Sequence, residues 1–224
     1  MSESSPSLAH LRADLHRAAE IADVGQRTLE VVAVIEEAAT PLGIRPTIVG
    51  GMAVYFWTEG DAFATYDIDV VMAVPEKLAE ILAQLGFVRS KDGRHWELPD
   101  TEVLLEAPSA DLDAGVQVAV VRLPSGRTAR VLSRVDILLD RLDEFQTTGH
   151  RLVAQQALVL LTELTAAEQA DLDARAPARR LTVIVDSMRR LARELPSRSE
   201  PPAVDELHEI ARAALRAEYS PRQS

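Results

Sequence analysis

The sequence predicts an α+β protein in which a mixed β-sheet is flanked by helices and followed by a C-terminal helical bundle. The first observation is an alternation of strand and helix patterns between residues 46 and 85. The second is a series of short β-branched segments between residues 87 and 132, separated by turn signals such as Asp92-Gly93. The third is a change to helical periodicity at Ser133.

Two amphipathic helices are expected before the first strand. Apolar residues recur at helical spacing in residues 6–23 and again in residues 26–40, where Pro41 ends the pattern. A strand is expected at residues 47–49, followed by a short helix at residues 52–58.

A second strand opens at Asp67, and Pro75 is well placed in the first turn of a helix that Gly86 ends. The segments expected as further strands are residues 87–89, 94–98, 101–106, 116–123 and 127–132. Together with the first two strands they predict a mixed sheet.

The last third of the chain reads as helical. The first helix there has an apolar face made of Val135, Leu138, Leu139, Leu142 and Phe145. Prolines separate the helices expected at residues 166–174, 177–195 and 203–217. We therefore divide the chain into residues 1–132, which hold the sheet and the N-terminal helices, and a C-terminal helical region at residues 133–224.

The composition narrows the classes of function. Of 224 residues, 47% are hydrophobic, which is enough for one sizeable core. No apolar run approaches the roughly 18–20 residues that cross a bilayer, and the first residues lack the pattern of a secretory signal. We expect a cytoplasmic protein with no membrane partner. Cysteine is absent, which excludes disulfides, thiolate zinc sites and cysteine nucleophiles.

The formal net charge of −11 argues against a surface that coats nucleic acids generally, because such surfaces carry basic stripes. A group of arginines nevertheless lies late in the chain, at positions 175, 179, 180, 189, 190 and 193. These side chains face either an RNA or acidic partner, or simply solvent on a charge-rich helix.

Two carboxylates lie close together in the second strand. Because side chains alternate across a strand, Asp67 and Asp69 project from one face, while Ile68 projects from the other. Like charges in an apolar sheet repel and lose hydration, so a cation that neutralises them is expected. Clustered oxygen ligands suit a hard ion such as Mg²⁺. The alternative is a solvated strand edge with no ligand.

A diglycine, Gly50-Gly51, follows the first strand and precedes the short helix. Residues without a Cβ adopt positive φ and let a phosphate approach the backbone where a helix begins. A plain turn is the alternative. The order strand, Gly-Gly, helix, strand with Asp-Ile-Asp favours a site for a nucleotide and a metal.

Gly50-Gly51, Thr65 and Asp67-Ile68-Asp69 together resemble the nucleotidyltransferase superfamily with the DNA polymerase β-like core, in particular its small bacterial AbiEii-type and MenT-type branch. The resemblance implies that residues 1–132 form a catalytic core. It implies that the glycines and Thr65 bind the triphosphate of an NTP, and that the aspartates hold two Mg²⁺ ions. A third carboxylate on a following strand would complete the site.

Two glutamates are candidates for the third carboxylate. Period two places Glu102 and Glu106 on the same face of the strand expected at residues 101–106. Similar enzymes have a glutamate followed closely by proline, as Glu106 and Pro108 stand here, and this favours Glu106. The alternative is an exposed edge strand whose charges have no function.

Some members of the superfamily contact the nucleotide with a lysine on a helix after the sheet. This chain has no lysine after Lys91, so the resemblance assigns that role to Arg141 or Arg151.

Two functions follow from these patterns. The first is an enzyme that transfers a nucleoside monophosphate from an NTP to a hydroxyl and releases pyrophosphate. The resemblance implies an RNA acceptor such as a tRNA end, a toxin-like role and an antitoxin protein as partner. The second is a non-catalytic module that keeps the fold and binds a nucleotide or a partner protein.

Overall fold

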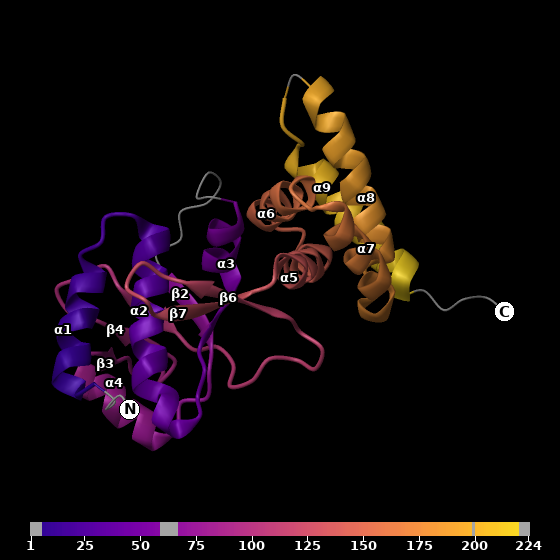
Figure 1. Cartoon of the computed structure of the whole chain (residues 1–224). Helices are drawn as coiled ribbons and strands as arrows, with labels where there is room; N and C mark the ends of the chain where they lie inside the picture. Colours follow the sequence, from indigo (N-terminus) through magenta and orange to yellow (C-terminus); the bar gives the residue numbers. More distant parts are fainter. Residues whose placement is uncertain (1–5, 59–66, 199, 220–224) are drawn as a thin grey trace. The chain divides into compact units, whose positions relative to one another are not determined.

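The computed structural model of the chain describes residues 6–58, 67–198 and 200–219 (Figure 1). The chain forms two compact units, Met1–Ser133 and Arg134–Ser224. The predicted α+β class with a mixed sheet is confirmed. Within the described ranges, no helix is both long enough and apolar enough to span a membrane.

The first unit contains a seven-stranded sheet, counted over the described residues, with the order β3-β4-β5-β2-β1-β7-β6. The strands are β1 (Thr47–Ile48), β2 (Asp67–Val71), β3 (Val88–Arg89), β4 (His95–Glu97), β5 (Leu104–Glu106), β6 (Val118–Arg122) and β7 (Thr128–Leu132). Strand β2 runs antiparallel to β1 and parallel to β5, and β1 runs parallel to β7. The sheet is therefore mixed at its centre, where the aspartates lie.

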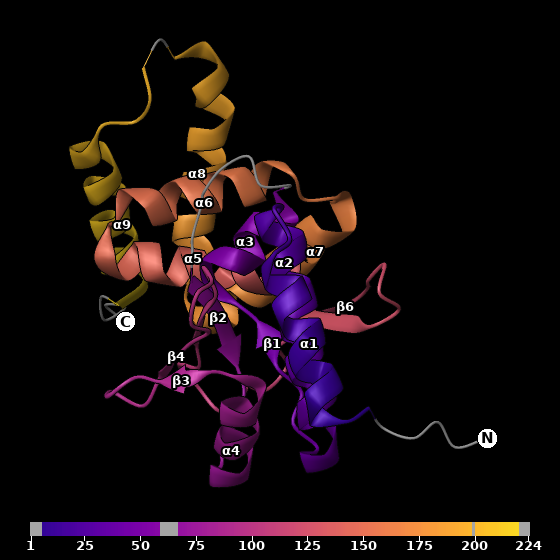
Figure 2. The ribbon, with the colours of Figure 1, turned by 90° about the vertical axis from the view of Figure 1, so that its left-hand side faces the viewer.

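Helices α1 (Leu8–Ala19), α2 (Val24–Ala39) and α4 (Glu76–Leu85) contact one another, and α2 also contacts β7. Figures 1 and 2 show α1 and α2 side by side. Ser7 and Asp23 cap the first two helices, each accepting a hydrogen bond from a backbone N–H three residues on. The buried side chains of this unit include Leu15, Val31, Ile35, Ile68, Val70, Leu78, Leu82, Trp96, Leu105 and Val131.

Helix α3 (Gly50–Trp57) follows β1 and contacts β2. It begins at Gly50, two residues before the predicted start, because Val49 is extended and acts as the N-cap. At its other end, Trp57 Nε1 donates a hydrogen bond of 2.8 Å to the backbone carbonyl of Leu132. The helix is thus tied both to β2 and to the end of β7.

The second unit is helical, as predicted from the periodicity after Ser133. Its helices are α5 (Arg134–Thr148), α6 (Arg151–Thr162), α7 (Ala166–Arg175), α8 (Thr182–Glu194) and α9 (Val204–Tyr219). Helix α5 contacts α6 and α9, and α8 contacts α9. Buried Asp136 of α5 pairs with Arg175, which ends α7.

The helix predicted at residues 177–195 starts later than expected. Residues Ala176–Arg179 form a 3₁₀ turn that includes Pro177, and Arg180 has a left-handed backbone with φ of 57°. The carbonyl of Arg180 accepts a hydrogen bond of 3.2 Å from Gln146 Nε2. This tertiary contact and the positive φ explain why α8 begins only at Thr182.

Candidate functional site

Strands β2 and β5 bring two predicted site residues into register. Asp69 is the parallel partner of Glu106, and Ile68 is the partner of Leu105. Ile68 and Leu105 are both buried, so Asp69 and Glu106 belong to the opposite face of the sheet. Asp67 lies two residues before Asp69 on this same face and is exposed.

Gly50 lies against Asp69. The backbone N–H of Val49 donates a hydrogen bond of 2.9 Å to the carbonyl of Asp69. The residue after Val49, Gly50, therefore lies beside the Asp69 side chain. Gly50 has a φ of +58°, and a Cβ placed on it would overlap Asp69 Oδ2 and lie 2.9 Å from Asp69 Cγ. Both the backbone conformation and the space therefore require glycine here.

The first turn of α3 starts at Gly50, with Gly51 as its second residue. The first N–H groups of a helix have no partner within the helix, and the helix dipole makes this end positive. Gly50 places that end next to the Asp69 carboxylate. A backbone end of this kind, free of a Cβ at Gly50, is suited to bind a phosphate.

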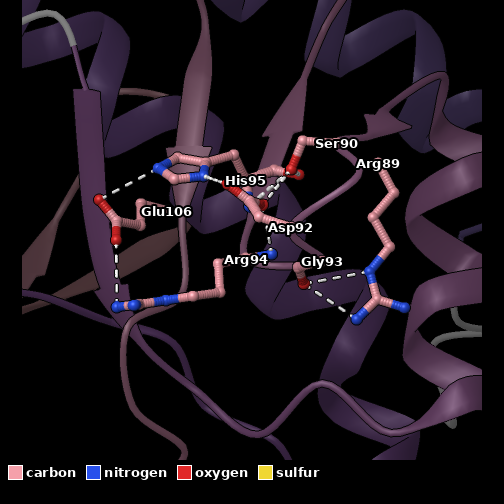
Figure 3. A network of polar contacts seen from close by, with 7 residues as sticks. All are labelled: Arg89, Ser90, Asp92, Gly93, Arg94, His95 and Glu106. Carbon is pink, nitrogen blue, oxygen red and sulfur yellow. Dashed lines mark hydrogen bonds and ion pairs between the residues drawn. The ribbon is translucent and has the colours of Figure 1, made fainter.

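Glu106 has cationic or cation-forming neighbours on β4 and in the turn that precedes it (Figure 3). Glu106 Oε1 lies 3.3 Å from an Arg94 guanidinium nitrogen, and Oε2 lies 3.4 Å from His95 Nε2. His95 is the antiparallel register partner of Glu106. His95, Glu106 and Asp69 therefore occupy one row across β4, β5 and β2.

The turn between β3 and β4 fixes the orientation of His95. Asp92 Oδ2 lies 2.7 Å from His95 Nδ1, and Asp92 Oδ1 accepts a hydrogen bond of 2.9 Å from the backbone N–H of Arg94. Hydrogen bonds from Ser90 and from the Arg94 backbone hold the pKa of Asp92 well below its usual range. The Asp92 hydrogen bond in turn raises the pKa of His95 above its ordinary value of 6.5.

The two candidate glutamates have different surroundings. Glu102 lies in a bend before β5, since the strand is shorter than predicted and begins at Leu104. Its exposed side chain pairs with Arg27 of α2 at 3.0 Å. Glu106 is the glutamate that lies in register with Asp69.

The remaining predicted site residues are Thr65, Arg141 and Arg151. Thr65 is outside the described residues. Arg141 and Arg151 belong to the second unit: Arg141 pairs with Asp140 at 2.6 Å and with Glu144 at 2.9 Å, while Arg151 is the exposed first residue of α6.

The residues on β2 and β5 fit a divalent cation by their chemistry. Carboxylate oxygens are the ligands that Mg²⁺ prefers, and the absence of a Cβ at Gly50 lets the Asp69 carboxylate lie directly against the start of α3. Across residues 6–58, 67–198 and 200–219, no three His, Cys, Asp or Glu side chains already surround a common metal position.

Sequence reasoning missed Arg94 and His95. A signal was present, because His95 alternates with apolar Trp96 directly after the Asp92-Gly93 turn and so belongs to the polar face of its strand. The pairing of β4 with β5, which brings both side chains to Glu106, joins segments that no local pattern connects.

The chain matches no protein-family model and no curated protein sequence. Solved structures that are similar to it include the following two. One is the antibiotic-resistance factor ANT(2'')-Ia in solution, with 21% identity, a TM-score of 0.43, and coverage of 65% of this chain and 88% of that one. The other is an antigenic nucleotidyltransferase-like protein from Paracoccidioides brasiliensis, with 19% identity, a TM-score of 0.45, and coverage of 66% of this chain and 87% of that one.

Proposed function

We propose that the protein is a metal-dependent nucleotidyltransferase that moves a nucleoside monophosphate from an NTP to a hydroxyl acceptor and releases pyrophosphate. The observation that carries the proposal is the parallel register of Asp69 and Glu106, with Gly50 packed against Asp69. This arrangement brings the glycine turn and the carboxylates together at one point of the sheet.

In this proposal Asp67, Asp69 and Glu106 hold two Mg²⁺ ions. Bound there, Mg²⁺ neutralises phosphate charge and lowers the pKa of the acceptor hydroxyl. The N–H groups of the Gly50-Gly51 turn bind the triphosphate at the start of α3. The acceptor oxygen forms a bond to the α-phosphorus, the bond to the leaving pyrophosphate breaks, and Glu106 accepts the proton of the acceptor hydroxyl. Positioning and charge do this work, so no nucleophilic side chain is required.

The remaining roles are proposed from the resemblance. Thr65 adds a contact to the triphosphate, and Arg141 or Arg151 contacts the nucleotide. The acceptor is RNA, with a tRNA end as the first candidate, and an antitoxin protein is the corresponding partner.

The test is incubation of the full chain with each α-³²P-labelled NTP, Mg²⁺ and total cellular RNA, with Asp69→Asn as the control variant. Label transferred to an acceptor by the wild type alone supports the enzyme. Binding of an NTP with no transfer to any acceptor would instead establish the alternative, a nucleotide-binding module with this fold.

A further inference from the structure

Both carboxylate oxygens of Glu106 have partners on the β3–β4 hairpin, defined here as residues 88–97. Arg94 approaches Oε1 at 3.3 Å and His95 approaches Oε2 at 3.4 Å (Figure 3). The Glu106 side chain is 23% exposed and that of Arg94 is 57% exposed. The ion pair is therefore open to solvent on the arginine side and partly exposed on the glutamate side.

The hairpin holds these two groups in place before any ligand arrives. Asp92 contacts His95 Nδ1 at 2.7 Å, which directs Nε2 to Glu106, and it also binds the backbone N–H of Arg94 at 2.9 Å. Arg89 closes the turn with hydrogen bonds of 3.1 and 2.9 Å to the carbonyl of Gly93. The arrangement around Glu106 is thus built by the backbone of the turn as well as by the side chains.

We propose that Arg94 and His95 are positioning residues that hold the Glu106 carboxylate on the β4 side in the metal-free protein. Their contacts with this carboxylate must break when a divalent cation binds to it. This inference rests on the proposed function, in which Glu106 is a metal ligand. A guanidinium carries a fixed positive charge, and a divalent cation on the same carboxylate would be repelled by it. The Arg94 contact therefore opposes metal binding and favours the metal-free arrangement.

The expected effect of Arg94 on metal affinity follows from the solvent exposure of the Arg94–Glu106 ion pair. Solvent-exposed ion pairs are weak, so Mg²⁺ displaces Arg94 readily, and removing Arg94 should tighten metal binding by about two- to fivefold. A residue with a merely structural role would show the opposite sign, because a loosened site binds metal less well. The direction of the change thus separates the two explanations.

The experiment is a titration of the full-length protein with Mn²⁺ alone, in which electron paramagnetic resonance measures the free ion. Arg94→Gln is expected to bind Mn²⁺ about two- to fivefold more tightly than wild type. Arg94→Lys, which keeps the charge, should restore the wild-type affinity. Lys91→Gln is the matched control, because it removes the same charge from an exposed position in the same hairpin.

Three results would overturn the inference. Unchanged or weaker Mn²⁺ binding by Arg94→Gln, with binding still dependent on Asp69, rejects the role of Arg94 and leaves the proposed function standing. An equal gain in Mn²⁺ affinity in Arg94→Gln and Lys91→Gln would mean that the change in net charge alone causes the gain. Wild-type Mn²⁺ binding by Asp69→Asn shows that the metal site itself is misassigned, and the inference then falls together with the proposed function.

Discussion

Asp69 and Glu106 are register partners on the adjacent parallel strands β2 and β5. Their side chains belong to the face opposite buried Ile68 and Leu105. Two acidic residues on paired positions repel each other unless a cation or a basic group lies between or beside them. In this structure Arg94 and His95 lie beside Glu106.

Glu106→Gln should lower the rate of nucleotidyl transfer by about a hundredfold, a loss typical of removing one charge-stabilising group. The variant keeps the shape of the side chain and removes its charge. Glu102→Gln is the matched control, because Glu102 pairs with Arg27 outside β5 and should retain most of the activity. Steady-state rates under saturating NTP and Mg²⁺ provide the comparison, and a larger loss for Glu102→Gln would show that the wrong glutamate was chosen.

Gly50→Ala should lower activity by about a hundredfold, because the new Cβ forces the Asp69 carboxylate to turn away from its position. Gly43→Ala is the control: Gly43 also has a positive φ, of +71°, but a Cβ there meets no atom within 4 Å. The left-handed backbone should cost each variant about 1–2 kcal/mol in free energy of unfolding, and Gly50→Ala should lose more than Gly43→Ala because Asp69 must also move.

Denaturant unfolding measures the loss of stability in these two variants, and NTP turnover measures the loss of activity. Comparing them separates the strain of a left-handed backbone from the effect of the contact between residue 50 and Asp69. If Gly50→Ala were as active as Gly43→Ala, the approach of Gly50 to Asp69 would have no part in the reaction.

The pKa of His95 should lie above 6.5 and should fall towards that value in Asp92→Asn, because the Asp92 hydrogen bond is the largest cause of the shift. A raised folded-state pKa means that the folded protein binds the proton more tightly than the unfolded chain. The resulting stabilisation is complete below pH 6.5 and is lost as pH rises through the folded-state pKa.

NMR titration of the histidine ring protons measures this pKa directly, and melting curves across the same pH range follow the stability. Asp113→Asn, an exposed aspartate outside the hairpin, serves as control. An equal pKa of His95 in wild type and Asp92→Asn would mean that the hydrogen bond between Asp92 and His95 does not form in solution.

Local patterns in the sequence predicted the local parts of this site. Alternation placed Asp67 and Asp69 on one face of β2, and the diglycine marked the start of α3. The predicted strand at residues 101–106 was too long, because residues 98–103 form a turn in which the Leu98 N–H donates a hydrogen bond to the Val103 carbonyl and Asp100 has a positive φ of 61°, so that the strand begins only at Leu104. Periodicity has no information about such a contact.

The pairing between strands could not be predicted in the same way. Whether Asp69 meets Glu106, and whether Glu106 meets His95, depends on the order and register of β2, β5 and β4. These strands are short, and each is joined to its partner by a long stretch of chain or by a turn whose type sets the register. Family resemblance favoured Glu106 over Glu102, whereas the contacts of Arg94 and His95 required the structure.

The most direct test of the central claim is Mg²⁺-dependent release of pyrophosphate from an NTP in the presence of total RNA, compared between wild type, Asp67→Asn and Asp69→Asn. Each substitution removes one carboxylate charge with little change in volume, so the circular dichroism spectrum should be preserved. We predict release by the wild type that EDTA abolishes and that neither variant shows. Near-normal release by both variants, or none by the wild type with any NTP, would contradict the assignment of this site to nucleotidyl transfer.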